Sequence, residues 1–399
     1  MVAVVILRGH KLSIPNAINK LFSALGLTDQ IATPGAYRKA RAKLKPELFV
    51  HLNQVVVAKF YELYGQQGRL RRWKGYRVVA ADGTYLQLPD TAETRERFTV
   101  QTNQVPGFAC VQALASVLYD VLDDVGLNVA LAPSSAETDL LIDKHAAHYG
   151  EGDLIVLDRL YADYSVFAAL THTQRRFVVR CARRGLEPIK QFWAGEAEEA
   201  IVTLEVPKTV RQKAIERGWP LEVRVRLVKV ELEGGEVEVL ATNLLEAGEA
   251  TRDELKQLYG LRWGIETYFG RIKGVFEVER FSGQDLRIIE QDIYGTIFLA
   301  TLESVLSRPA DEELAEASQQ RGHTWVQGVN RATSYAALLD EAVVLLADPA
   351  ADTEQILDRL HKLFKTGPSL RRPGRHRPRA DLTPSRRLRF HKYRKRIVA

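Results

Sequence analysis

Cysteine is scarce in this chain, and long hydrophobic runs are missing. Cys110 and Cys181 are the only two cysteines among 399 residues, and they form no CxxC pair. This usage argues against a disulfide scaffold and predicts a reducing compartment. The start, MVAVVILRGHKL, has a short apolar run without a basic segment or a small-residue cleavage site, and no later run is long enough to span a membrane. We therefore expect a cytoplasmic protein without an export signal or membrane anchor.

Histidine and cysteine motifs for zinc are also missing. His145 and His148 are expected to share a helix face, but no HExxH sequence or cysteine pair accompanies them, so zinc-dependent hydrolysis is disfavoured. The hydrophobic fraction of 46% is ordinary for a folded protein, and the length allows two or three domains.

Acidic residues are almost absent from the C-terminal segment. Residues 366–399 hold 12 Lys or Arg and one Asp, a local charge of +11, which against the whole-chain charge of +6 leaves −5 for the other 365 residues. The segment has few apolar residues and several prolines, so we expect an extended arm that binds a polyanion. The arm residues proposed to contact it are Arg375, Arg377, Arg386, Arg387, Arg394 and Lys395.

Two further basic clusters interleave aromatic and cationic residues. They are YRKARAKLK at 37–45 and RLRRWKGYR at 69–77. This pattern suits contacts with phosphates together with base stacking, and neither cluster has the broad apolar face of a membrane-binding helix. A merely solubilising surface is the alternative for each cluster alone. The predicted nucleic-acid contacts are Arg38, Lys39, Arg41, Arg71, Arg72 and Trp73.

Hydrophobic periodicity divides the chain into segments. The first 75 residues read as helices, residues 77–184 as strands that then alternate with helices, and residues 185–250 as strands only. This order predicts a mixed α/β fold. The expected divisions are a helical, basic N-terminal domain (1–75), the first part of a mixed α/β core (76–184), a β-strand insertion (185–250), completion of that core (251–307), a helical C-terminal region (308–365) and the basic arm (366–399).

One stretch, YGLRWGIETYFGRIK at 259–273, is predicted to form a helix with an unusual stripe. Thr251 and Glu254 form a capping-box signature before it, and Ser282 with Asp285 repeat the signature before a second long helix. At helical spacing, four residues of the stretch share one narrow face that is not apolar: Tyr259, Arg262, Glu266 and Lys273. A solvated helix face is the plain alternative.

Three acids are candidates for phosphodiester chemistry, which requires hard oxygen ligands for divalent metal ions. Asp82 follows the apolar run RVVAA, Asp158 closes LIVLD, and Glu266 lies on the capped helix. Each also has a structural reading: an Asp-Gly hairpin, a helix cap and a surface ion pair, respectively.

These residues resemble a known family. The spacing Tyr-x2-Arg-x3-Glu-x6-Lys is the signature of bacterial insertion-sequence transposases of the IS-four type, within the DDE transposase group. ADGT and DRLYAD resemble the motifs that carry the first and second acids of that family, and VERFSGQDLRIIEQDIY resembles the stretch after its signature helix. The resemblance extends from about residue 34 to the basic arm.

The resemblance implies a ribonuclease-H-like catalytic core in which Asp82, Asp158 and Glu266 bind two Mg²⁺ ions, with Mn²⁺ as a substitute. Asp82 would lie on the first strand and Asp158 at the end of the fourth. It further implies cleavage of double-stranded DNA at transposon ends, joining of the 3′-hydroxyl to target DNA, and phosphate contacts from Tyr259, Arg262 and Lys273. A homodimer in the synaptic complex and a nucleoid location are expected.

Two positions depart from the family pattern. Leu160 replaces the glycine that is usual in the second motif, and the strand EVEVLATNL lacks the tryptophan that stacks a flipped base in relatives. Trp193 and Trp219 are candidate substitutes, with packing in a β subdomain as the alternative. Competing functions are a ribonuclease-H-like nuclease without strand transfer, a catalytically silent DNA-binding regulator and, more distantly, a glycosidase with paired carboxylates.

Overall fold

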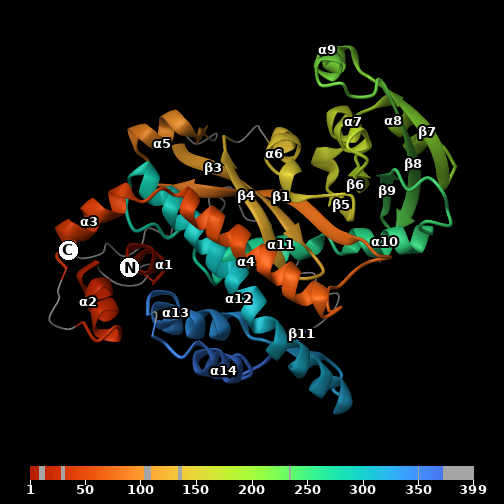
Figure 1. Cartoon of the computed structure of the whole chain (residues 1–399). Coiled ribbons are helices and arrows are strands. Elements are labelled where there is room, and N and C mark those ends of the chain that lie inside the picture. The colour runs from red at the N-terminus through yellow and green to blue at the C-terminus, as the bar shows by residue number, and fades with distance from the viewer. Residues whose placement is uncertain are drawn as a thin grey trace. The chain divides into compact units, whose positions relative to one another are not determined.

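A computed structural model of the chain describes residues 1–8, 14–27, 32–102, 109–133, 137–232, 235–348 and 350–371 (Figure 1). The chain forms two compact units. One comprises Met1–Val56, Gln87–Glu96 and Gly270–Ala399, and the other comprises Val57–Leu86 and Arg97–Phe269. The second unit contains all three candidate acids.

A nine-stranded sheet organises the second unit. Its strands are β1 (Arg77–Leu88), β2 (Thr99–Thr102), β3 (Ala109–Asp120), β4 (Val125–Ala132), β5 (Asp153–Leu157), β6 (Arg176–Cys181), β7 (Glu199–Glu205), β8 (Glu222–Glu231) and β9 (Val237–Thr242). The strand order is β2-β3-β1-β5-β6-β9-β8-β7, and β4 also pairs with β3. Strands β1, β5 and β6 run parallel, whereas β3 and β4 pair antiparallel. The order β4-β3-β1-β5-β6 with this polarity is that of a ribonuclease-H-like fold, so the predicted fold class is confirmed.

The helices of this unit include two that the sequence pattern did not predict. Besides the second half of α4 (Glu47–Gln66) and most of α11 (Trp263–Gly274), its helical segments are α6 (Glu137–Asp143), α7 (Tyr164–His172), α8 (Glu187–Ala194), α9 (Lys208–Glu216), α10 (Arg252–Gly260), and 3₁₀ turns at Ala146–His148 and Arg159–Tyr161. The expectation that 185–250 holds only strands is wrong, because α8 and α9 lie there. Pro188 is the second residue of α8, and Pro207 is the N-cap of α9. A proline near a helix start is a common signal, but the alternating strand pattern around these two obscured it. Strands β7, β8 and β9 extend the main sheet through the pairing of β9 with β6.

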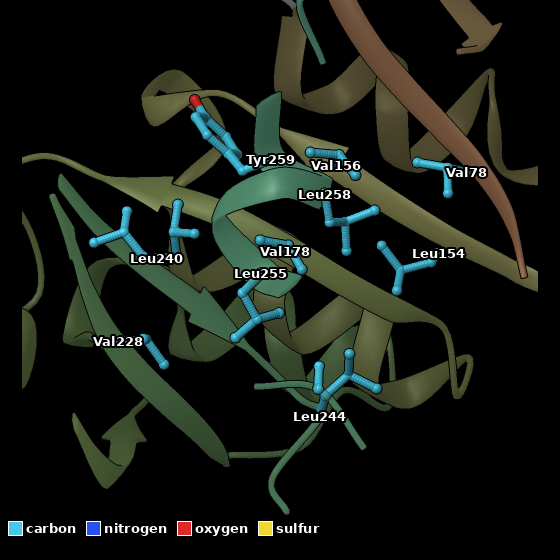
Figure 2. Close-up of a cluster of buried hydrophobic side chains, with 12 residues drawn as sticks. Val78, Leu154, Val156, Val178, Val228, Leu240, Leu244, Leu255, Leu258 and Tyr259 are labelled. Carbon is cyan, nitrogen blue, oxygen red and sulfur yellow. The ribbon is translucent and has the colours of Figure 1, made fainter. Parts of the chain in front are cut away.

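Helix α10 packs its apolar side on the sheet. Leu255, Leu258 and Tyr259 join a buried cluster with strand residues (Figure 2). The strand residues of this cluster are Val78, Leu154, Val156, Val178, Val228, Val230 and Leu240. The capping box of Thr251 and Glu254 begins the helix as predicted.

The predicted single helix over 259–273 is not observed. Helix α10 ends at Gly260, and a new helix, α11 (Trp263–Gly274), begins after a turn at Leu261 and Arg262. The four signature residues therefore do not form one continuous stripe. Tyr259 is buried as a member of the hydrophobic cluster, which corrects the expectation that this face is not a core face.

The other compact unit is mainly helical. Its elements are α1 (Val2–Arg8), α2 (Ile14–Ala24), α3 (Pro34–Lys43), α5 (Ala92–Arg97), α12 (Leu286–Gln320), β10 (Val326–Gly328), α13 (Arg331–Ala347), α14 (Thr353–Phe364) and β11 (Ser369–Arg371), with the first half of α4 (Glu47–Gln66). Helix α1 packs on α12 and α13, so the N-terminal helices share a unit with the C-terminal ones. No helix in the described ranges combines the length and apolar character needed to cross a membrane.

Several predicted boundaries in this unit differ from the structure. Helix α12 continues through Pro309, so the expected division between 307 and 308 falls inside a helix. Its N-cap is Asp285 alone, because Ser282 bonds to Asp292 instead. The first residues of the expected arm are not free chain, since β11 pairs antiparallel with β10. The remaining arm contacts, Arg375 to Lys395, lie outside the described residues.

Candidate active site

Two neighbouring strands place the first two acids side by side. In the parallel pair of β1 and β5, Ala81 is the partner of Leu157, and Asp82 and Asp158 are the next residue on each side. Strand β1 continues to Leu88, so the Asp-Gly pair at 82–83 is not a hairpin turn. The two carboxylates consequently share one position along the sheet.

Asp158 is fixed by the turn that it begins. It is the N-cap of the 3₁₀ turn Arg159–Tyr161, and its Oδ1 accepts a hydrogen bond of 2.8 Å from the Leu160 N–H. Leu160, which replaces the usual glycine, is not among the residues with positive φ. This loop therefore accommodates leucine without left-handed backbone strain.

Arg262 joins the third acid to the first. Its Nη2 donates a 2.8 Å hydrogen bond to Glu266 Oε1, and its Nη1 lies 3.6 Å from Asp82 Oδ2. The guanidinium is buried, with 5% of the residue exposed, and its Nε makes no hydrogen bond to any described residue. The turn between α10 and α11 positions this arginine, and the first turn of α11 carries Glu266.

The positive charge of Arg262 only partly balances the negative charge of the three acids. Burial raises the pKa of Asp82 to about 6, and Asp158 and Glu266 add to the rise, whereas the Gly83 N–H and Arg262 oppose it. Burial also disfavours the charge of Arg262, but the Tyr259 hydroxyl and the two carboxylates outweigh it and raise the arginine's pKa. Perturbed carboxylates of this kind are characteristic of functional sites.

Glu137 is a fourth acid at the site, and the sequence analysis missed it. Its Oε1 accepts a 3.2 Å hydrogen bond from the Tyr161 hydroxyl. Burial raises the pKa of Glu137 to about 7, and the charges of Asp82 and Asp158 contribute. In the sequence, Glu137 is an ordinary acid in the first turn of a helix, so no local pattern distinguishes it from a residue that only stabilises the helix end.

One predicted DNA contact is a structural residue. Arg41 is 4% exposed and donates to Gln291, Ser282 and Asp292 at 2.8, 2.6 and 2.7 Å. The prediction for Arg41 is therefore wrong, because its guanidinium has no face left for a phosphate. Its neighbours Arg38 and Lys39 on α3 are exposed, so a DNA contact from them stays a prediction.

The second basic cluster is partly engaged within the protein. Arg71 bonds through its backbone N–H and side chain to Asp123 and the Leu122 carbonyl. Arg72 lies 3.5 Å from Asp123, and Trp73 packs against the buried cluster under α10. Both arginines remain exposed, so a DNA contact from them stays a prediction.

Lys273 and the tryptophans are the remaining residues predicted to contact DNA or to stack a flipped base. Lys273 belongs to the other compact unit, where burial lowers its pKa. Trp219 is 7% exposed, which favours packing over base stacking, and Trp193 lies under the Arg183 guanidinium. Trp263, beside Arg262, is 46% exposed.

A buried histidine network is not a second catalytic site. His145 lies between α6 and the following 3₁₀ turn, so it does not share an α-helix with His148 as predicted. Asn128 Nδ2 donates to His145 Nδ1 at 3.0 Å, so the ring proton is on Nε2. His145 Nε2 then donates to Ser116 Oγ at 3.0 Å. Burial lowers the pKa of His145 to about 3, which keeps it neutral. The group is structural, because a serine nucleophile would need the opposite tautomer.

The carboxylate oxygens at the acid site are the type of ligand that binds a hard divalent cation. Carboxylate oxygens are the preferred ligands of Mg²⁺, and added positive charge would relieve the repulsion that raises the pKa of Asp82. Within the described residues, however, no three His, Cys, Asp or Glu side chains are arranged to hold a metal ion. Glu266 instead bonds to Arg262, so it would have to exchange this partner for a cation.

The chain is similar to known proteins in structure and in sequence. The chain is similar to a solved chain of the piggyBac transposase synaptic complex with hairpin DNA, at 8% identity and a TM-score of 0.45 over 91% of this chain and 74% of that one. It is 24% identical over 294 residues to transposase InsG for insertion sequence element IS4 of Escherichia coli (strain K12), covering 71% of this chain and 63% of that protein. The family model described as "Transposase DDE domain" matches residues 73–302, a range that contains all three predicted acids.

Proposed function

Because this chain belongs to the family with a transposase DDE domain, we propose that it is a DNA transposase that cuts at the ends of an insertion sequence and joins them to target DNA. The observation that carries the proposal is the convergence of three acids. Asp82 and Asp158 lie at one position on paired strands, and Arg262 connects Asp82 to Glu266. The similarity to the IS4-element transposase supports the same function.

Each residue of the site would have a distinct role. Mg²⁺ bound by Asp82, Asp158 and Glu266, for which Mn²⁺ could substitute, would supply the Lewis acidity needed for attack on a phosphodiester. The Leu160 N–H orients Asp158, and the Gly83 N–H orients Asp82 through a 2.8 Å bond to its Oδ1. Arg262 holds the first and third acids together through their carboxylates, so its role lies with the acids more than with phosphates.

The atoms and charges of the proposed cutting and joining reactions balance without a further cofactor. In cutting, a water oxygen forms a bond to phosphorus and the 3′-oxygen leaves with a proton. In joining, the freed 3′-hydroxyl oxygen forms a bond to a target phosphorus, its proton is released, and the target's own 3′-oxygen leaves and takes up a proton. One phosphodiester replaces another in the second reaction, so no nucleotide has to be hydrolysed.

DNA binding would come from exposed cations. Arg38 and Lys39 on α3, Arg71 and Arg72 before β1, and the arm beyond residue 371 are the candidates. The buried Tyr259, whose ring centroid lies 5.6 Å from the Arg262 guanidinium carbon, would support that arginine and not contact DNA itself. A homodimer that holds two ends is part of the proposal.

An assay of joining separates this function from its alternatives. DNA carrying the element's own terminal repeats is incubated with Mg²⁺ and a target plasmid, and both cut and joined products are measured. A transposase gives both products. Cutting without joining indicates a nuclease, and specific binding without cutting indicates a silent regulator.

A further inference from the structure

The carboxylate of Glu137 lies against the backbone of the strand that carries Asp82. A Cβ atom placed on Gly83 would lie 2.5 Å from Glu137 Oε1 and 2.8 Å from its Cδ, which is closer than real Cβ atoms approach. Leu114 Cδ1 would lie 2.6 Å from the same Cβ, so the Glu137 carboxylate and the Leu114 side chain together occupy the space that any larger residue at position 83 would need. Glycine directly after Asp82 has a physical reason, since it admits a second carboxyl group beside the first.

The same carboxylate is tied to the segment that carries Asp158. Tyr161 ends the 3₁₀ turn that Asp158 begins, is fully buried, and donates its hydroxyl to Glu137 Oε1 at 3.2 Å. Glu137 thus contacts the backbone next to one acid and the turn of the other. It belongs to α6, an element that none of the three acid motifs includes.

Among the residues that the structure describes, no cation pairs with Glu137 in return. Its described hydrogen-bond donors are a phenol and a backbone N–H, and its charged neighbours are Asp82 and Asp158. Arg262, the cation of this site, has its described contacts with Asp82 and Glu266. A carboxylate held among carboxylates by neutral donors costs stability in the metal-free protein, and a bound cation would recover that cost.

We propose that Glu137 is a fourth carboxylate of the active site, held by Gly83 and Tyr161 so that its charge strengthens the binding of a divalent cation by Asp82 and Asp158. This inference rests on the proposed function. Glu137 is a positioning residue: it acts on the cation's affinity and on the spacing of the two acids, and it need not touch DNA.

The test is Mn²⁺ binding to the metal-free full chain, measured by titration calorimetry with and without terminal-repeat DNA. Glu137→Gln removes the charge but keeps an acceptor for Tyr161, and it should weaken Mn²⁺ binding by about tenfold. It should also leave the melting temperature of the metal-free protein unchanged or raise it. A merely structural residue would lower the melting temperature when it is replaced, so a lower melting temperature would contradict the proposed role.

Two further variants keep the test independent of one substitution. Gly83→Ala keeps the charge of Glu137 but forces its carboxylate and the Leu114 side chain aside, and it should also weaken Mn²⁺ binding. Asp139→Asn is the matched control, because Asp139 is an exposed acid on the same helix that pairs with Lys213 at 2.9 Å. It should leave the affinity for Mn²⁺ as in the parent.

The outcomes separate this inference from the proposed function. If Asp82→Asn loses Mn²⁺ binding while Glu137→Gln and Gly83→Ala bind as the parent does, the role of Glu137 is overturned and the three-acid site stands. If the parent binds no Mn²⁺ with or without DNA, both proposals are overturned.

Discussion

Arg41 and Arg262 are buried against carboxylates in different compact units of this protein, and their surroundings differ. Arg41 uses Nε and both terminal nitrogens in bonds to Gln291, Ser282 and Asp292, and Ser282 also donates to Asp292. Arg262 leaves its Nε without a described partner and lies among acids that outnumber it. The first cluster completes its own hydrogen bonds, whereas the second holds unbalanced negative charge.

The difference distinguishes a stabilising cluster from a functional one. A buried ion pair tolerates burial only when geometry and additional hydrogen bonds compensate both charges, which is the condition around Arg41. A site that must accept a cation has to keep negative charge in excess. The raised pKa values of Asp82 and Glu137, about 6 and about 7, are the electrostatic sign of that excess.

The largest expected effect on stability comes from breaking the satisfied cluster. Arg41→Met leaves Asp292 buried without its cation, so the free energy of unfolding should fall by about 3–5 kcal/mol. Urea unfolding followed by circular dichroism measures this change. A variant as stable as the parent would mean that the Arg41 cluster is not a stabilising one.

The opposite sign is expected at the acid site. Asp82→Asn removes a buried charge among like charges, so it should raise the free energy of unfolding of the metal-free protein at pH 8 by roughly 1–3 kcal/mol. Asp292→Asn is the matched control and should lower it, because Asp292 is the acid that compensates Arg41. If both variants are destabilised alike, the contrast between the two clusters is lost.

The pH dependence of the free energy of unfolding should also show the excess of negative charge at the acid site. A carboxyl group whose folded pKa is raised holds its proton in the folded state after the unfolded chain has released it. The contribution of Asp82 and Glu137 to the free energy of unfolding therefore falls as pH rises from about 4 to about 7 in the absence of metal. The difference in stability between parent and Asp82→Asn, measured across this range, should grow with pH. A difference that does not change with pH would contradict the assigned environment of Asp82.

The smallest effect is expected on the exposed face of α3. Arg38→Gln and Lys39→Gln should change stability by less than about 0.5 kcal/mol. If these residues contact phosphates, each should also reduce the salt dependence of binding to terminal-repeat DNA by about one unit of slope. Binding measured by fluorescence anisotropy at several salt concentrations tests this. An unchanged slope would mean that Arg38 and Lys39 contact solvent and not DNA phosphates.

Local signals in the sequence predicted the parts of the fold that depend on neighbours in the chain. The capping box at Thr251 and the buried strand residues directly before Asp82 and Asp158 have short-range patterns, and the structure contains them. The break between α10 and α11 was missed because helical spacing continues across it, while Tyr259 turns into the core. The burial of Arg41 depends on Asp292, which lies 251 residues away.

Long-range packing also explains why the fourth acid was missed. Glu137 reaches the site only because α6 places it over Gly83 and beside Tyr161. In sequence, each of these residues has an ordinary local reading: a first-turn acid, a turn glycine and a tyrosine after a turn. The three acids were found because a family signature marks them, and the additional carboxylate has no such mark.

The account depends most on Glu266, which Arg262 connects to Asp82 on the sheet. Glu266→Gln keeps an acceptor for the Arg262 N–H and keeps α11 intact, so folding and binding of terminal-repeat DNA should match the parent. The direct measurement is the rate of Mg²⁺-dependent cutting of that DNA by the folded variant. The predicted result is a loss on the order of 10³-fold or more at unchanged DNA affinity. Cutting at the parental rate would contradict the three-acid site.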